Sequence, residues 1–406
     1  MSNLNTSTTA QVIENDQQAM NAAYQVADFA LVERNIRDQQ RILPVDVIQQ
    51  LSQKGLNGIR IAKQYGGAQV SVKTLVHIFR ILSKADASVG QIPQNQFGLL
   101  NAIDHIANEQ QKQFIYSEIL KGKRLANGGP ERTTKDTTTV ATRLDLINGQ
   151  YVLNGEKFYS TGSYFADYLA IRAVHPEGHI VLSIIDAKAN GVDIKDDWDG
   201  FGQRTTASGT VTLKNVVVKP ELILKEDVLA NPTKYRGAFS QIIQVAIDVG
   251  IAEAAFADTL STIHKARPIV DANVDKASFE AFTLQEVGKL NILLDVAILL
   301  LDEAAEYLDE LDAQNLNSDV KVNAEQASRA SIIVAEAKVY ANDAALNISE
   351  KLIELGGSRS SLAVHNLDQH WRNARVHTLH DPVRWKLFAI GNYYLNGEQK
   401  HRHAWI

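Results

Sequence analysis

The spacing of apolar residues changes twice along this chain of 406 residues, and no other feature of the sequence constrains the fold as strongly. Helical spacing extends to about residue 123, short strand-like runs occupy residues 124–232, and long helical patterns follow. Apolar residues at i, i+3 and i+4 indicate amphipathic helices, whereas short runs bounded by turn residues indicate strands. We therefore predict a mainly α protein with a central small antiparallel β-domain. Its three domains are an N-terminal helical domain (1–123), a middle β-domain (124–232) and a C-terminal helical bundle (233–406).

The middle domain is predicted from turn residues and short apolar runs. Asn148-Gly149 and Asn154-Gly155 are dipeptides that favour tight hairpin turns, because both central residues of such a turn need positive φ. Further strands are expected at 168–174, 180–185 and 210–218. These runs predict a small antiparallel β-domain.

The last domain is predicted from four periodic stretches, at 241–264, 279–311, 323–355 and 382–395. These four stretches, two of them long, predict an up-and-down bundle of four helices. One face of the third stretch carries many alanines, which let helices approach closely and also suit a subunit interface: Ala327, Ala330, Ala335, Ala337, Ala341, Ala344 and Ala345.

Composition excludes several classes of function. The chain has no cysteine, so disulfides, thiolate catalysis and cysteine-ligated zinc are excluded. A net charge of −6 without a basic patch argues against nucleic-acid binding. The apolar run at 292–301 is interrupted by Asp295 and is too short to span a membrane, and the polar N-terminus lacks the apolar core of a signal peptide. We expect a cytoplasmic protein that binds neither nucleic acid nor membrane.

Nucleotide-binding signatures are absent from the sequence. Neither G-x-G-x-x-G nor G-x-x-x-x-G-K-[ST] occurs, so the chain lacks the usual motifs for holding NAD(P)H or ATP. If the protein carries out redox chemistry, it needs another cofactor, and a flavin requires neither motif.

The densest group of polar and aromatic residues lies at 370–382, with two arginines, three histidines and an aspartate. Pro382 disfavours the helical conformation at Asp381, so His380 and Asp381 are expected on a turn. Loops held by a rigid scaffold often carry catalytic groups. The alternative is a solvated connection in which Asp381 caps the next helix.

Three further segments have a structural and a functional interpretation. Gly356, Gly357 and Ser358, followed by Arg359, suit either a helix C-cap or a phosphate cradle. The segments 126–131 and 158–163 are either plain turns or loops that present amides and small polar side chains to a flat ring. His401 and His403 lie in the terminal tail without an acidic partner nearby, and we expect no metal site.

Six motifs, in order along nearly the whole chain, resemble those of the acyl-CoA dehydrogenase superfamily. They are Tyr65-Gly66-Gly67, Asp86-Ala87-Ser88-Val89-Gly90, the run from Tyr151 to Gly162, Gly202-Gln203-Arg204-Thr205-Thr206-Ala207-Ser208, Leu355-Gly356-Gly357 and Arg372-Asn373-Ala374-Arg375. The resemblance implies a helical domain, a β-domain and a four-helix bundle around a flavin.

One departure from the family pattern decides between its branches. Dehydrogenases of the family commonly carry a catalytic glutamate in a Y-E-G-T turn after the R-D-A-R/K run, where this chain has His380-Asp381-Pro382-Val383. This turn, with the later G-N-Y-Y-L-N-G, resembles instead the flavin-dependent monooxygenase branch, which includes dibenzothiophene monooxygenases and sulfur-acquisition oxidoreductases.

The resemblance implies a reduced-flavin-dependent monooxygenase that acts on a small organosulfur or related compound. It implies FMN, with FAD as the alternative, a separate flavin reductase as partner, and a homotetramer or homodimer. Residues expected around the flavin are Asn127, Ser160, Thr161, His380 and Asp381, with Asn127, Ser160, His380 and Asp381 as the catalytic set. Arg267, Gly356, Gly357 and Ser358 are expected to meet its phosphate across a subunit interface. Relatives often carry a histidine where this chain has Gln96.

Two alternatives remain open at this point. In an FAD-dependent acyl-CoA dehydrogenase, Asp381 would act as the base and an electron-transfer flavoprotein would accept the electrons. A protein of the same fold that has lost the flavin would be non-catalytic.

Overall fold

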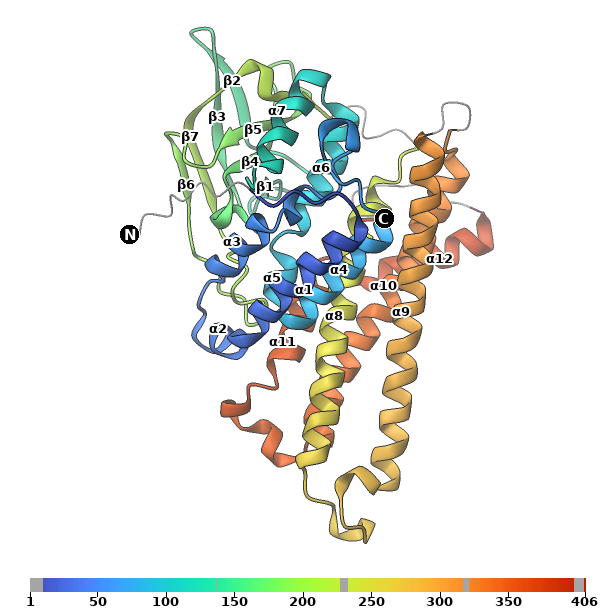
Figure 1. Ribbon diagram of the computed structural model, residues 1–406. Coiled ribbons are helices and arrows are strands. Elements are labelled where there is room, and N and C mark those ends of the chain that lie inside the picture. Colours follow the sequence, from blue (N-terminus) through green and yellow to red (C-terminus); the bar gives the residue numbers. More distant parts are fainter. Residues whose placement is uncertain (1–9, 137, 227–232, 317–320, 398–404) are drawn as a thin grey trace.

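The computed structural model describes residues 10–136, 138–226, 233–316, 321–397 and 405–406 (Figure 1). A twisted sheet lies beside the N-terminal helices, and a long helical bundle extends away from both. The predicted fold class, mainly α with a central small β-domain, is confirmed. The boundaries 1–123, 124–232 and 233–406 stay predictions.

The N-terminal part is helical throughout. Its helices are α1 (Asp16–Val32), α2 (Arg34–Gln40), α3 (Val45–Gln53), α4 (Val72–Ala85), α5 (Ala87–Gln91), α6 (Gln94–Ile106) and α7 (Glu109–Leu120). Helices α6 and α7 are separate because Asn108 caps α7 through a reciprocal pair of hydrogen bonds with Gln111. Asp86 caps α5 by accepting from the amides of Ser88 and Val89.

The sheet has the strand order β6-β7-β3-β2-β4-β5-β8, and β1 pairs with β4 in parallel. Its strands are β1 (Leu125–Gly128), β2 (Arg143–Ile147), β3 (Gln150–Lys157), β4 (Tyr168–Val174), β5 (Ile180–Asp186), β6 (Val192–Ile194), β7 (Val211–Val218) and β8 (Ile223–Lys225). Asn148-Gly149 forms the expected turn between β2 and β3. The predicted turn at Asn154-Gly155 is wrong. These residues lie inside β3, where the register against β7 shifts between Leu153 and Gly155, as in a β-bulge.

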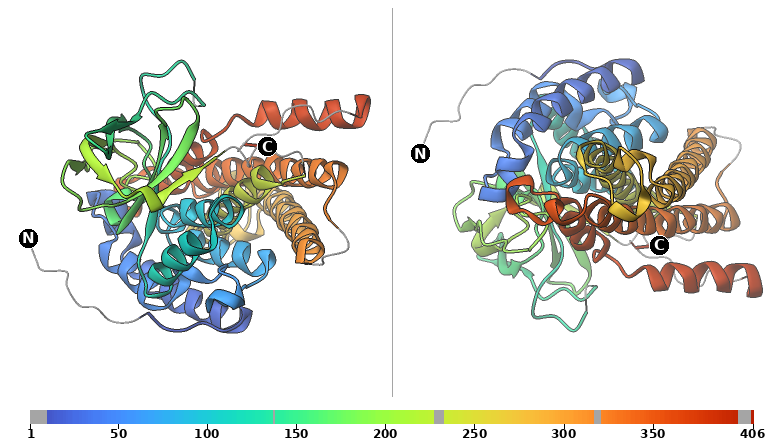
Figure 2. Two further views of the ribbon diagram at one scale, coloured as in Figure 1. Left: turned by 90° about the horizontal axis from the view of Figure 1, so that it is seen from above. Right: turned by 90° about the horizontal axis from the view of Figure 1, so that it is seen from below.

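The bundle consists of α8 (Arg236–Lys265), α9 (Ala281–Leu316) and α10 (Ala324–Leu355), followed by α11 (Gln369–Thr378) and α12 (Val383–Asn396). Helix α8 runs through the centre and packs on α10 and α4, while α12 extends outward from the body (Figure 2). Among the described residues, α8 alone is long and apolar enough to cross a membrane, and 83% of its apolar window is buried inside the protein. Such burial is typical of a core helix.

Close backbone approaches join the three parts. A side chain at Gly250 of α8 would meet the carbonyl of Arg80 on α4 at 2.5 Å. A side chain at Gly202 would meet the carbonyl of Arg372 on α11 at 1.9 Å, and the amide of Gln203 donates to the Asn373 side chain at 2.7 Å. The loop after β6 is therefore fixed against α11, immediately before the turn that carries His380.

Candidate active site

The loop after β3 presents a free hydroxyl to the interior. Tyr159 adopts a left-handed conformation with φ of 55°, which is uncommon for an aromatic residue. Ser160 is fully buried, yet its Oγ has no hydrogen-bond partner among the described residues. Thr161 differs, because its Oγ1 lies 2.7 Å from Oγ of Ser208. A buried hydroxyl without a partner is costly in a protein interior, so Ser160 is suited to a ligand that supplies one.

Asn127 lies on β1, where it pairs with Ala170 of β4. Its side chain is partly buried and makes no hydrogen bond to the rest of the described chain. A side chain at Gly129 would meet the Asn127 amide oxygen at 3.0 Å, so glycine keeps the space beside this amide open. Asn127 therefore offers a free donor and a free acceptor.

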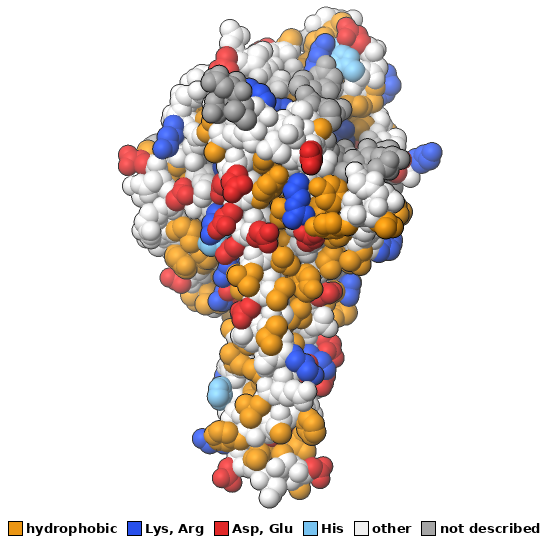
Figure 3. Space-filling model, turned by 90° about the vertical axis from the view of Figure 1, so that its right-hand side faces the viewer, with side chains coloured by type: hydrophobic (Ala, Val, Ile, Leu, Met, Phe, Trp, Pro, Cys, Tyr) orange, Lys and Arg blue, Asp and Glu red, His pale blue; other side chains and the backbone are white. Residues whose placement is uncertain are grey.

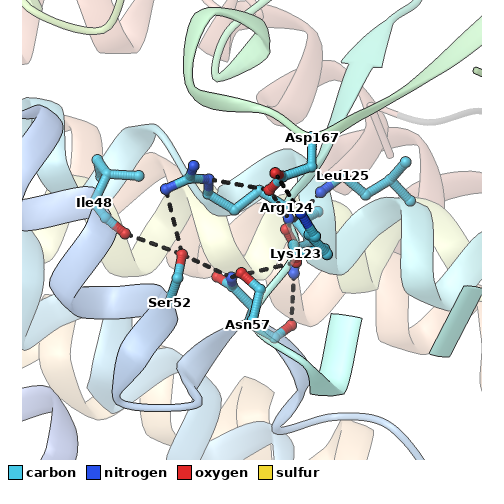
Figure 4. A network of polar contacts seen from close by, with 9 residues as sticks. Ile48, Ser52, Asn57, Lys123, Arg124, Leu125 and Asp167 are labelled. Atoms are coloured by element: carbon cyan, nitrogen blue, oxygen red, sulfur yellow. Dashed lines mark hydrogen bonds and ion pairs between the residues drawn. The ribbon is translucent and has the colours of Figure 1, made fainter. Parts of the chain in front are cut away.

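Polar contacts fix the start of β1 (Figure 4). Asn57 donates to Oγ of Ser52 at 3.0 Å, and Arg124 lies beside Asp167. Gln96 completes the arrangement: its amide donates to the Asn57 carbonyl at 2.7 Å and accepts from the Leu125 amide at 3.0 Å. Both ends of the buried Gln96 side chain are thus occupied by backbone groups, and in this chain the residue positions β1.

His380 and Asp381 lie between α11 and α12. Nδ1 of His380 lies 3.1 Å from Oδ1 of Asp381, while the imidazole keeps 34% of its surface exposed. Asp381 is buried and pairs with Nζ of Lys386 at 2.7 Å. The Gln241 amide donates to both carboxylate oxygens, at 3.2 and 3.3 Å, in the orientation that satisfies both groups. The helix cap considered for Asp381 is wrong, because α12 has Pro382 at its N-cap and no side chain caps it.

The charge state of Asp381 follows from these partners. Burial alone would raise the pKa of this carboxyl. The hydrogen bond with His380 and the charges of Lys338 and Lys386 outweigh burial, and the pKa lies below its usual value. Asp381 is therefore a stable carboxylate at neutral pH.

A buried polar chain behind this turn is not apparent from the sequence motifs. Asp248 of α8 pairs with Nζ of Lys338 on α10 at 2.8 Å and with Nδ1 of His377 on α11. Nε2 of His377 lies 2.7 Å from Oε1 of Gln244, whose amide donates to Gln94 of α6 at 2.8 Å. One signal could have revealed it: Asp248 is a lone charge within an apolar helical run, and buried charges need partners.

The buried polar network from Asp248 to Gln94 lies between the two groups of candidate residues, the Ser160–Gly162 loop and the His380–Asp381 turn. Gln94 begins α6, and the preceding Ile92 has its carbonyl 2.9 Å from where a side chain on Gly162 would lie. Gln241 and Gln244 occupy one face of α8, and they contact Asp381 and His377. The Ser160–Gly162 loop therefore borders the start of α6 and the His380–Asp381 turn borders α8, and the hydrogen bond between Gln94 and Gln244 joins these two helices.

The residues expected to bind the cofactor phosphate lie away from Ser160 and His380. Arg267 is exposed just beyond the end of α8, and Gly356 ends α10. A side chain at Gly356 would meet Thr262 of α8 at 2.6 Å, so the two helix ends are adjacent. Gly357 and the exposed Ser358 follow directly. In Figure 1 this end of the bundle points away from the sheet, so a single chain does not bring these residues to Ser160 or His380.

Three family models match consecutive parts of the chain. They describe the N-terminal domain of acyl-CoA dehydrogenase at residues 14–123, its middle domain at 130–216 and its C-terminal domain at 242–385. The chain belongs to the acyl-CoA dehydrogenase family. The superfamily expected from the sequence motifs is confirmed.

Relatives of this acyl-CoA dehydrogenase family member include monooxygenases. Dibenzothiophene monooxygenase of Rhodococcus qingshengii is 30% identical over 86% of each chain. A probable FMNH2-dependent monooxygenase, SfnC of Pseudomonas putida, is 26% identical over 86% of this chain and 87% of its own length. The structure of FMN-bound TdsC from Paenibacillus sp. A11-2 superimposes with a TM-score of 0.89 at 28% identity, over 96% of this chain and all of TdsC. The monooxygenase branch expected from the sequence is likewise confirmed.

We predict that Asp381→Asn destabilises the protein at neutral pH and flattens its acid response. The variant leaves Lys386 buried without its partner, which costs about 3–5 kcal/mol of unfolding free energy. The pKa of Asp381 is lowered on folding, so its contribution is present above the unfolded value of about 4 and is lost as pH falls below it. The difference between wild type and variant, measured by urea unfolding, should be largest near neutral pH and shrink in acid.

The exposed Asp193→Asn on β6 removes one carboxylate without a buried partner and serves as the control. A difference between wild type and Asp381→Asn that stays constant from neutral pH into acid would contradict this account.

Proposed function

We propose that this protein is a reduced-FMN-dependent monooxygenase that oxygenates the sulfur of a small organosulfur compound. Reduced FMN supplies two electrons to O2, so that one oxygen atom is transferred to sulfur and the other leaves as water. The observation that carries the proposal is the His380–Asp381 turn. Here a salt-bridged aspartate occupies the segment where a dehydrogenase needs a free base.

FMN is the cofactor that the site fits. The free hydroxyl of Ser160 and the free amide of Asn127 supply a donor and an acceptor for the polar edge of a flavin ring. Thr161, held by Ser208, lines the same loop. In this assignment Asn127 and Ser160 orient the ring and its neighbouring oxygen atoms.

His380 is the group that moves a proton. Asp381 holds Nδ1 of the imidazole, and Nε2 is left free of protein partners among the described residues. Hydrogen bonding at one nitrogen fixes which nitrogen is available for proton exchange. Asp381 is a positioning residue in this account, because its own oxygens already face His380, Lys386 and Gln241.

Acyl-CoA dehydrogenation by Asp381 is less well supported. A general base is most effective when its pKa lies near the working pH, whereas the pKa of Asp381 is lowered. The carboxylate is also buried and engaged by three side chains. No feature of the site favours this second function.

The source of electrons is a separate protein in our proposal. The sequence lacks the usual nicotinamide-binding motifs, so a flavin reductase would deliver reduced FMN. An electron-transfer flavoprotein would take its place only if the protein were a dehydrogenase.

A second copy of the chain completes the site in our proposal. Arg267, Gly357 and Ser358 are exposed at the end of the bundle remote from the sheet, where a partner could place them against the FMN phosphate. Hydrophobic side chains run along the bundle surface in Figure 3. Large exposed apolar side chains on α9 and α12 include Phe282, Ile292, Leu299, Trp385, Phe388 and Leu395. Such patches mark association surfaces, and we propose a homodimer or homotetramer.

We predict that His380→Ala uncouples the reaction. With reduced FMN, O2 and either dibenzothiophene or thioanisole as probe, oxygenated product should fall about 100-fold or more, while hydrogen peroxide rises. FMN binding should be retained. Product is measured by chromatography and peroxide by a coupled assay. His77→Ala, which removes a partly exposed histidine of α4 that pairs with Asp302 of α9, is the control. Unchanged product per reduced FMN consumed would show that His380 has no such role.

We also predict complementation between two inactive variants. Ser160→Ala removes a group proposed to contact the flavin ring, and Arg267→Ala removes a group proposed to contact the FMN phosphate. If the ring contacts of each site come from one chain and its phosphate contacts from the other, a mixed dimer contains one intact site. Co-expression with distinguishable tags should then restore roughly a quarter of wild-type activity, because half of the randomly formed dimers are mixed and each has one of two sites intact. Restored activity near zero in purified mixed oligomers would contradict the shared site.

A further inference from the structure

The hairpin that joins β4 to β5 carries two histidines and a glutamate in five residues. His175 and His179 flank the turn Pro176-Glu177-Gly178. The amide of His175 donates to the carbonyl of His179 at 2.8 Å, and Gly178 adopts a positive φ of 89°. The backbone of this turn is therefore tightly closed, and it fixes the two imidazoles next to the end of β4 and the start of β5.

The three side chains converge. Nδ1 of His175 lies 3.8 Å from Oε2 of Glu177, and Nδ1 of His179 lies 3.7 Å from the same oxygen. All three candidate ligand atoms fall within 4.8 Å of one another. A tetrahedral ion with bonds of about 2.0–2.2 Å needs ligand atoms roughly 3.3 Å apart. The two distances from the Glu177 carboxylate exceed that spacing by a few tenths of an ångström, and a movement of the largely exposed Glu177 side chain shortens both.

The histidines have few other interactions. His179 makes no side-chain hydrogen bond within the described chain, and its Nε2 is buried without a partner. The two rings stack at 4.5 Å, an arrangement that disfavours charge on both. Nδ1 of His175 accepts a long 3.3 Å hydrogen bond from the Glu177 amide, which a metal ion bound at this nitrogen replaces.

We propose that His175, Glu177 and His179 form a surface site for a divalent transition-metal ion of the zinc class. Two imidazole nitrogens and one carboxylate oxygen suit Zn²⁺, Ni²⁺ or Cu²⁺ better than Mg²⁺ or Ca²⁺, which prefer oxygen ligands alone. The exposed side of the set is left to water. A bound ion ties the end of β4 to the start of β5. Because β4 pairs with β1, the ion supports the strand that carries Asn127.

The test is calorimetric titration of the metal-free full-length protein with Zn²⁺. One ion should bind per chain. His179→Ala should weaken binding at least about tenfold, and Glu177→Gln should weaken it less. Far-UV circular dichroism checks that each variant is folded. Mg²⁺ at the same concentrations should give no binding.

The terminal tail offers a competing pair, His401 and His403, which lie outside the described residues. The double variant His401→Ala/His403→Ala is therefore the matched control and should bind Zn²⁺ as the wild type does. The proposal is overturned if Zn²⁺ does not bind at up to about 1 mM. It is also overturned if binding is lost with the tail histidines and kept in His179→Ala.

Discussion

Asp248, in the middle of α8, is the point at which three helices of the bundle are joined by buried polar contacts. It is fully buried and faces Lys338 of α10 and His377 of α11. Burial would raise the pKa of Asp248, but the charges and hydrogen bonds of its two partners hold the pKa below its usual value. A buried ion pair of this kind adds little stability compared with apolar packing, but removing one partner is strongly destabilising. The interaction therefore constrains how α8, α10 and α11 pack more than it adds to their stability.

The packing of α8, α10 and α11 also fixes the position of the candidate active site. His377 lies in the last turn of α11, and the backbone amide of His380 donates to its carbonyl at 3.0 Å, so the position of one histidine determines the other. On the opposite side, Gly202 and Gln203 attach the β-domain to α11, and Gly162 lets the Ser160 loop approach Ile92, between α5 and α6. The free hydroxyl of Ser160 and the exposed ring of His380 are thus presented by elements whose packing leaves little freedom. Loops on a rigid scaffold of this kind are typical of catalytic sites.

The sequence predicted the fold because each domain has its own periodicity, and because strand and helix limits follow turn and cap residues. Tyr168–Val174 is a strand as expected, whereas Asn154-Gly155 was read as a turn although it forms a bulge inside a strand. Local residue types cannot distinguish these cases, since the partner strand β7 decides the outcome. At the site, the motifs predict Ser160 and His380, and these assignments stay predictions. The motifs did not indicate Lys338 or Gln244. In the sequence these are ordinary helix residues, and only their contacts with Asp248 and His377 in the folded protein reveal them.

The central claim is that oxygen from O2 enters the product, and isotope labelling tests it most directly. The protein is supplied with reduced FMN and thioanisole under ¹⁸O2 in unlabelled water, and the product is analysed by mass spectrometry. Our account predicts one labelled oxygen on sulfur per molecule of product. Product that carries only oxygen from water would contradict it, as would bleaching of the bound flavin by an acyl-CoA without O2 and without any sulfur oxygenation.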